Sequence, residues 1–285
     1  MTGRKQGIMY ILMAAFFFAL MNLFIRLAGD VPTMQKCFFR NAVAAVISAS
    51  ALIKSGKGFK PKEGNLKYLF LRATGGTIGL FCNFYAIDNL NISDASILNK
   101  LSPFFAMVFS VFILKETADK KEWGLVALAF FGAVFVVKPS FSGESVPALI
   151  GVISGIAAGF AYTYVRMLGQ RGERGPLIVF FFSAFSCIAT LPNMIFNYSP
   201  MSVRQVIFLL LTGAFAAGGQ FCITAAYTKA PAKEISVFDY SQVVFAAVLG
   251  MLFLNQFPDI LSIIGYVIII SAAVLKWHYG LKAEK

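Results

Sequence analysis

Long apolar segments follow one another along the chain, each separated from the next by a short polar connection. A helix needs about 20 mostly apolar residues to cross the ~30 Å hydrocarbon layer of a bilayer. Ten segments qualify, of which the fifth is short, and their approximate bounds are Ile8–Leu27, Thr33–Ile53, Leu66–Ile87, Ser93–Leu114, Trp123–Val137, Val146–Leu168, Pro176–Phe196, Val203–Tyr227, Ile235–Leu254 and Ile260–Trp277. The pattern therefore predicts an all-α polytopic membrane protein with ten transmembrane helices and tight antiparallel hairpins.

The composition agrees with this class. The chain is 58% hydrophobic and 13% charged, with a mean hydropathy of +0.75. A soluble domain has a charged fraction of about 25%, so few residues remain for a domain outside the membrane. The first span is too long for a signal-peptide core and lacks a small-residue cleavage site, so we expect it to be retained.

The net charge of +12 is distributed unevenly between the two predicted sides of the membrane. With the N-terminus inside, the cytoplasmic segments hold eighteen Lys and Arg residues and the outer segments hold four. Cytoplasmic loops are enriched in these residues, so we predict a multi-pass protein of the cell (inner) membrane with both termini cytoplasmic. The same residues suit anionic lipid headgroups. A topological origin of the charge gives no reason to expect a nucleic-acid partner.

The second half of the chain repeats the first in a constant register, in which Gly79 aligns with Gly219. Between Gly79 and Asp119, ten of 41 ungapped positions are identical to their counterparts in this register. Each half holds five spans, an odd number, so the halves must lie upside down relative to each other. We therefore predict two inverted five-helix repeats, residues 1–140 and 146–278. Many secondary transporters have this architecture, with the site near the midplane between the repeats.

Short motifs around the fourth and fifth spans give the chain a resemblance to a known family. Leu101-Ser102-Pro103-Phe104 enters the fourth span, Leu114-Lys115-Glu116 closes it, and Trp123-Gly124 opens the fifth. Over essentially its whole length the sequence resembles the drug/metabolite transporter superfamily, EamA type. The second half departs from the pattern, with Val243 at the position of Pro103 and Gln256 at that of Glu116. The resemblance implies a secondary transporter whose central cavity is lined mainly by helices one, three, four, six, eight and nine, and it implies no substrate.

The fourth span carries polar residues near its middle, where a charge costs at least about 2.5–3.5 kcal/mol on insertion scales. Residues three or four apart share a helix face. The polar positions are Ser96, Asn99, Lys100 and Pro103, and their counterparts in the ninth span are Ser236, Asp239, Tyr240, Gln242 and Val243. One interpretation is a midplane site in which Lys100 binds a carboxylate and Asp239 binds an amine or a proton. The other is a structural ion pair between these two residues.

Other spans add polar candidates. Asn22 and Tyr162 match across the repeat, and these two residues and Tyr85 could bind a solute or tie helices together. For Arg40 and Arg72, the favoured interpretation is snorkelling towards a membrane interface or a structural role near it. The candidate substrate-binding residues are Lys100, Asn99, Asp239, Tyr240, Asn22, Tyr162, Ser96, Gln242, Tyr85 and Arg40. Comparable residues outside this set are Asn83, Gln220 and Thr224.

Glycines recur at four-residue spacing in two spans, as Gly75 and Gly79 and as Gly151, Gly155 and Gly159. Small residues at this spacing let helix backbones approach closely. Helix packing is therefore their favoured role.

Motifs of several other function classes are absent from the sequence. There is no G-x-x-x-x-G-K-[ST] loop for ATP, the four cysteines have no C-x-x-C spacing, and the single histidine, His278, lies at the C-terminal edge. No nucleophile–base pair stands out within a span. We therefore expect no cofactor, no metal and no enzymatic activity. An intramembrane enzyme and a channel remain remote alternatives, because inverted repeats with mid-helix polar groups favour alternating access.

These features predict a secondary active transporter that moves a small polar organic metabolite by alternating access. Opposite charges on the two matching stripes make an amino acid or related zwitterion the first choice. The alternative is an anionic carboxylate metabolite, for which Lys100 and Arg40 supply positive potential while Asp239 serves structure or coupling. The expected partners are the small-molecule substrate and the lipid bilayer. Proton coupling through Asp239 is a hypothesis, and a homodimer is left open.

Overall fold

The computed structural model describes residues 3–56, 58–115, 119–137, 145–229 and 236–282, and all regular structure in these ranges is helical. The elements are α1 (Gly3–Leu27), α2 (Thr33–Lys54), α3 (Leu66–Asn89), α4 (Ile92–Asn99), α5 (Ser102–Phe109), η1 (Ser110–Leu114), α6 (Lys120–Val137), α7 (Val146–Gln170), α8 (Gly175–Phe196), α9 (Val203–Lys229), η2 (Ser236–Tyr240), α11 (Ser241–Leu254) and α12 (Ile260–Lys282). Glu116, Ile235 and the side chains of Thr224 and Ser236, named above, lie outside the described residues.

Seven helical segments of the described chain are long and apolar enough to cross a membrane. They are Lys5–Leu27, Thr33–Lys54, Ile92–Leu114, Val146–Gln170, Gly175–Phe196, Val203–Ile223 and Ile260–Tyr279. The other three predicted spans coincide with α3, α6 and the η2–α11 segment, which are helical but fall outside this set. The all-helical class is therefore confirmed, whereas the number of ten crossings stays a prediction.

The predicted fourth span is not one continuous helix. It is divided into α4 and α5, with a π-helical turn, η1, at its end. Pro103, in the first turn of α5, has no backbone N–H and cannot donate to the carbonyl of Asn99. The series of backbone hydrogen bonds along the helix is therefore interrupted there. The predicted ninth span is divided at the matching place, where the 3₁₀ turn η2 precedes α11. Both polar stripes therefore lie where a helix is interrupted.

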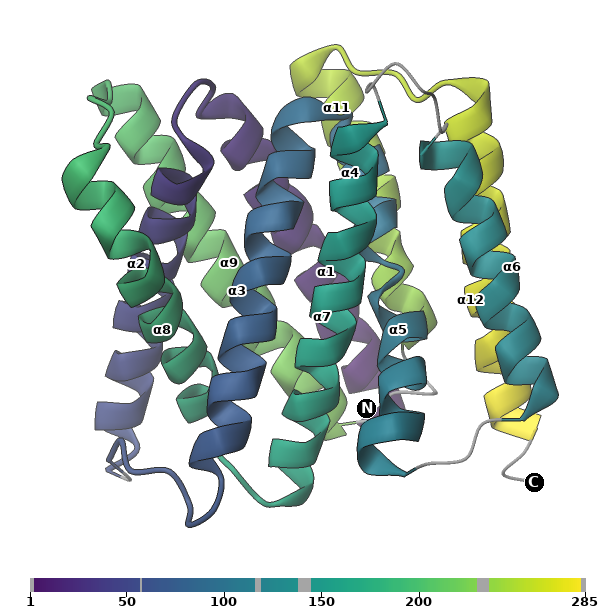
Figure 1. Cartoon of the computed structure of the whole chain (residues 1–285), viewed down its shortest axis with the longest axis horizontal. Coiled ribbons are helices and arrows are strands. Elements are labelled where there is room, and N and C mark those ends of the chain that lie inside the picture. The colour runs from purple at the N-terminus through teal and green to yellow at the C-terminus, as the bar shows by residue number, and fades with distance from the viewer. Residues whose placement is uncertain (1–2, 57, 116–118, 138–144, 230–235, 283–285) are drawn as a thin grey trace.

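Helices from the two halves pack against each other in pairs. The most extensive contacts join α1 to α9, α3 to α7, α2 to α8, and α6 to α12. Figure 1 shows the α6–α12 pair at one flank of the bundle and the α2–α8 pair at the other. Two buried apolar clusters, one containing Phe84 and the other containing Phe104, fill the space between the helices. Each cluster contains residues of both halves.

The glycines of α7 provide the close helix contacts that their spacing predicts. A Cβ atom at Gly151 would lie 2.9 Å from Leu98 Cδ1, and one at Gly155 would lie 2.7 Å from the carbonyl oxygen of Leu98. At Gly159 it would lie 2.6 Å from the Cβ of Phe105. Because no side chain fits at these positions, the packing role is confirmed, and α7 holds both parts of the divided α4–α5 segment in place.

Candidate functional site

A cavity of about 90 Å³, lined by polar and apolar side chains and partly open to solvent, lies between helices of both halves. Its lining residues are Phe18, Met21, Arg40, Arg72, Gly76, Gly79, Leu80, Asn83, Asn99, Lys100, Ala158, Ala161, Tyr162, Phe182, Gln220 and Gln242. The predicted helices one, three, four, six, eight and nine all contribute. Arg40 on α2 and Phe182 on α8 add the second and seventh helices. Arg40 is a candidate from the sequence, whereas Phe182 is not.

Lys100 and Asp239 form a buried ion pair beside this cavity. Lys100 Nζ lies 2.6 Å from Asp239 Oδ2, and the exposed fractions of the two residues are 5% and 6%. Tyr240 Oη donates a hydrogen bond to the backbone oxygen of Lys100 at 2.9 Å, so two contacts join the two helix breaks. Lys100 lines the cavity, whereas Asp239 and Tyr240 are not among its lining residues. The structural ion pair considered as one interpretation is therefore present.

Arg40 and Arg72 correct the sequence interpretation. Both were expected near a membrane interface, yet both are buried and line the cavity. Each guanidinium group lies over the ring of Phe182, with Cζ 5.4 Å from the ring centroid for Arg40 and 3.9 Å for Arg72. Snorkelling is therefore wrong for both residues. The helix rotation that packing imposes turns their side chains inwards instead.

The remaining candidates divide into cavity residues and helix ties. Asn99, Tyr162 and Gln242 line the cavity. Asn22 Nδ2 donates to Ser96 Oγ at 3.0 Å, which ties α1 to α4 outside the cavity lining. Their part in substrate binding stays a prediction.

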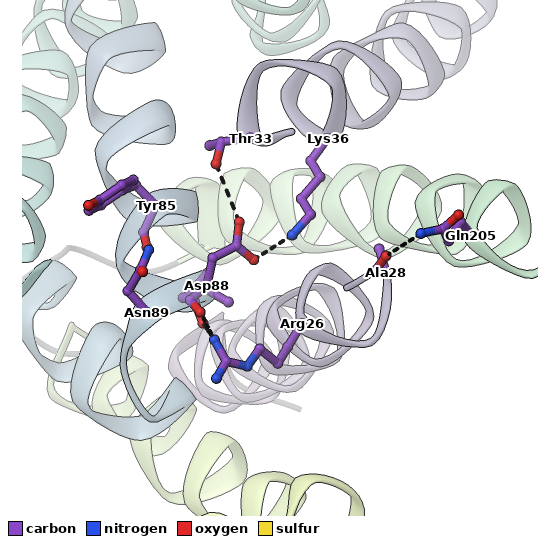
Figure 2. A network of polar contacts seen from close by, with 9 residues as sticks. Arg26, Ala28, Thr33, Lys36, Tyr85, Asp88, Asn89 and Gln205 are labelled. Atoms are coloured by element: carbon purple, nitrogen blue, oxygen red, sulfur yellow. Dashed lines mark hydrogen bonds and ion pairs between the residues drawn. The ribbon is translucent and has the colours of Figure 1, made fainter. Parts of the chain in front are cut away.

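Tyr85 is the candidate that the fold places apart from the others. Its side chain is 37% exposed, and the residue is absent from the cavity lining. Its backbone oxygen accepts a hydrogen bond from Asn89 Nδ2 at 2.8 Å (Figure 2). Asn83, two residues earlier on α3, does reach the cavity.

The sequence interpretation missed Arg72 as a cavity residue although a signal was available. Arg72, Gly76, Gly79 and Asn83 recur at intervals of four, three and four residues, which places them on one face of α3. All four line the cavity. Phe182 carries no such signal, because it is one of 31 phenylalanines in an apolar chain.

Comparison with known proteins decides the family. The sequence model of the EamA-like transporter family matches residues 5–138 and again residues 146–276. The chain belongs to the EamA-like transporter family. The resemblance to the drug/metabolite transporters is thereby confirmed.

Relatives of this EamA-like transporter span its whole length. The pseudopaline exporter CntI of Pseudomonas aeruginosa (strain UCBPP-PA14) is 32% identical over 273 residues, which are 95% of each chain. Human solute carrier family 35 member G1 is 23% identical and aligns over 97% of this chain and 81% of its own. One solved crystal structure, 17% identical, covers 96% of each chain with a TM-score of 0.64, a likeness of fold alone.

The EamA-like transporter is therefore a multi-pass membrane protein with a transport function. The names of the family and its relatives indicate no catalytic activity. Within the described ranges, no group of three or more His, Cys, Asp or Glu side chains is placed to hold a metal ion.

The EamA-like transporter has a second buried charge network, at one end of the bundle (Figure 2). Lys36 on α2 is 1% exposed, and its Nζ lies 2.5 Å from Asp88 Oδ1 at the end of α3. Thr33 Oγ1 donates to the other carboxylate oxygen at 3.3 Å. Arg26 Nη1 donates to the backbone oxygens of Ile87, at 2.9 Å, and Asp88, where α3 ends and a positive charge is favourable. The network joins α1, α2 and α3.

Proposed function

We propose that this EamA-like transporter is a secondary active carrier that moves a small polar organic metabolite across the cell membrane by alternating access. The observation that carries the proposal is the position of the cavity at the helix breaks of both halves. Asn99 and Lys100 reach it from the end of α4, and Gln242 reaches it from the start of α11. Secondary transporters with inverted repeats use discontinuous helices in this way to build a site near the midplane.

The helix pairs support an inverted arrangement of the halves. The first half is α1, α2, α3, α4–η1 and α6, and the second is α7, α8, α9, η2–α11 and α12. If every helix is replaced by its counterpart in the other half, the α1–α9 pair becomes the α7–α3 pair. The α2–α8 and α6–α12 pairs are then unchanged, because each joins a helix to its own counterpart. In Figure 1, α1 runs upwards and α7 downwards, and α1 begins on the side where α12 ends. We extend the proposal to ten crossings, with repeats 1–140 and 146–278 and both termini cytoplasmic.

The charges at the cavity favour an anionic carboxylate metabolite over a zwitterion. The zwitterion hypothesis needs Lys100 and Asp239 each to bind a substrate group, whereas they bind each other at 2.6 Å. Arg40 and Arg72 then leave a net positive charge at the cavity, because no ion pair of the described residues includes either of them. A zwitterion remains the alternative, and it would have to open the Lys100–Asp239 pair on binding.

We take export as the direction, since the relative from Pseudomonas aeruginosa is named an exporter. Asp239 is the group that we propose to couple transport to protons. Its Oδ2 pairs with Lys100, and its Oδ1 has no hydrogen-bond partner in the described part of the chain. Protonation of Asp239 would release Lys100 towards the cavity, and this change would link proton binding to solute binding.

Reconstitution into proteoliposomes tests the carrier. A solute that stabilises the purified protein in a thermal screen is labelled, and its uptake should saturate and be accelerated by the same solute inside the vesicles. Asp239→Asn should abolish flux driven by a pH gradient and retain exchange between equal pools. Non-saturating flux, or an ionic current across a planar bilayer, would show a channel instead.

Cysteine labelling in intact cells tests the orientation. Lys60 and Arg171 are exposed in connections at the same end of the bundle, where the Arg174 guanidinium donates a hydrogen bond to the backbone oxygen of Lys60. Cysteines at both positions should react with a membrane-impermeant maleimide only after the cytoplasmic face is opened. Labelling of both from outside would reverse the topology.

A further inference from the structure

Two arginine side chains are buried against one aromatic ring at the cavity. The exposed fractions are 3% for Arg40 and 4% for Arg72, and both groups lie over Phe182. A guanidinium group is attracted to the face of an aromatic ring. That attraction orients the two groups, but it neither neutralises their charge nor satisfies their N–H donors.

Several of these donors are unused. Arg40 Nη1 donates to Asn41 Oδ1 at 2.7 Å, whereas Arg40 Nε, Arg72 Nε and Arg72 Nη1 have no hydrogen-bond partner in the described ranges. No carboxylate of those ranges forms an ion pair with either residue. Removing charges from water without a partner is unfavourable, and intramembrane charges of this kind are typical of solute pathways.

The backbone makes room for the Arg72 guanidinium. Gly76 follows Arg72 by one helical turn, and a Cβ atom there would overlap Arg72 Nη1 and lie 2.9 Å from Phe182 Cε2. With a side chain at this position, the guanidinium or the ring would have to shift from where it lies. The arrangement is therefore built by three elements, α2, α3 and α8, rather than by one long side chain that happens to turn inwards.

We infer that Arg40, Arg72 and Phe182 form an anion-binding subsite for a dianionic solute, a dicarboxylate. This inference rests on the proposed transport function and gives it a substrate class. The planar fork of a guanidinium matches the two oxygens of a carboxylate. Two positive charges without counter-charges call for two negative ones, since Asp239 already neutralises Lys100. The amides of Asn83 and Gln242 line the same cavity and suit a polar solute body.

Thermal unfolding of the purified full-length protein, with diacids as probes, tests the subsite. Succinate, glutarate and adipate are compared with their monoamides and diamides, which keep the length and reduce the charge. At least one diacid should raise the melting temperature more than its monoamide, and its diamide should have no effect. Equal stabilisation by a diacid and its diamide, stabilisation by inorganic phosphate alone, or no response to any diacid would overturn the inference.

Variants then assign the effect to the arginines. Arg72→Lys keeps the charge but loses the fork, so diacid affinity should fall about 10-fold, and Arg72→Met should lower it about 100-fold. Without solute, Arg72→Met should melt no lower than the wild type, because it removes an unpaired buried charge.

The control Arg174→Met loses hydrogen bonds to the backbone oxygens of Gly58 and Lys60 and should melt lower with diacid affinity unchanged. Unchanged diacid affinity in Arg72→Lys and Arg72→Met would overturn the inference.

Gly76→Ala provides an independent test that keeps both arginines. The new methyl group should displace the Arg72 guanidinium and weaken diacid binding. Gly124→Ala, where a Cβ meets no atom within 4 Å, is the matched control and should bind as the wild type does. Wild-type affinity in Gly76→Ala would count against the geometry proposed.

The two proposals fail in different ways. Diacid binding that requires Arg72, without counterflow in proteoliposomes, would refute the carrier mechanism and retain the subsite. Counterflow of a neutral solute that is unaffected by Arg72→Met would refute the subsite and retain the carrier.

Discussion

Lys115 and Asn255 occupy equivalent positions in the two repeats and share a left-handed backbone, with φ angles of 59° and 54°. Within the described ranges they are the two non-glycine residues with positive φ. Each directly follows the end of its span, after Leu114 of η1 and Leu254 of α11. The two residue types differ, so the duplication has kept a backbone conformation at this position without keeping the side chain.

Asn255 should therefore tolerate glycine better than a branched residue. Left-handed backbone costs L-residues roughly 1–2 kcal/mol, with glycine exempt and asparagine tolerant. We expect Asn255→Gly to melt at or above the wild type, and Asn255→Val to lose about 1–2 kcal/mol of stability. Thermal unfolding of the purified protein checks this, with Lys115→Gly as the matched change in the first half. A valine variant as stable as the glycine variant would contradict it.

Gly159 and Gly169 allow a comparison within one helix. A Cβ at Gly159 would press on the Cβ of Phe105 and the backbone nitrogen of Ala106, whereas one at Gly169 would meet nothing within 4 Å. Gly159→Ala should cost about 1–3 kcal/mol through overpacking, and Gly169→Ala should be neutral or add up to about 1 kcal/mol through helix propensity. Equal melting temperatures for the two variants would show that α7 and α5 are not in close contact.

The Lys36–Asp88 pair should contribute strongly to stability. Asp88→Asn leaves the ammonium of Lys36 buried without a counter-charge, which should cost about 2–3 kcal/mol because the Asp88 side chain is partly exposed. The double variant Lys36→Met with Asp88→Asn should recover much of the loss. Asp30→Asn, at an exposed acid in the connection between α1 and α2, is the control and should stay within about 0.5 kcal/mol of the wild type. An Asp88→Asn protein that melts like the Asp30→Asn control would argue against a buried pair.

Glu173 joins the connection between α7 and α8 to the one between α2 and α3. Burial opposes ionisation of its carboxyl group, but three hydrogen bonds to the ionised form outweigh that effect and lower its pKa below the ordinary value. Asn65 Nδ2 donates to Oε2 at 3.0 Å, the backbone N–H of Lys62 donates to Oε2 at 2.8 Å, and that of Arg174 donates to Oε1 at 3.1 Å.

Stability should therefore fall in acid partly through Glu173. Because the folded-state pKa is lower than the unfolded one, the contribution is fully present above the unfolded pKa of about 4.3. It is lost as the pH falls through the folded pKa. Between about pH 6 and pH 3, the wild type should lose its stability advantage over Glu173→Gln. Melting curves across that range check the prediction, with Glu63→Gln, at an exposed acid, as the control.

The sequence by itself determined the class, the location of the helices and the register of the duplication. Apolar length is a local property, so the spans could be found without knowing any contact. The register of the repeat also aligned Lys100 with Tyr240, the neighbour of Asp239, and so predicted two matching polar stripes. The fold joins these stripes through Lys100 Nζ and Asp239 Oδ2, which lie 2.6 Å apart.

The tertiary structure alone decided which polar groups meet at the cavity. In a membrane helix the side facing lipid is as apolar as the side facing other helices, so hydropathy does not give the rotation of a helix about its axis. Arg72 is long enough to reach an interface, and only the packing of Gly76 against Phe182 turns it inwards. For the same reason the sequence did not show that Asp88 is the partner of Lys36. Asp88 lies 52 residues away, and no local pattern gives the orientation of its helix.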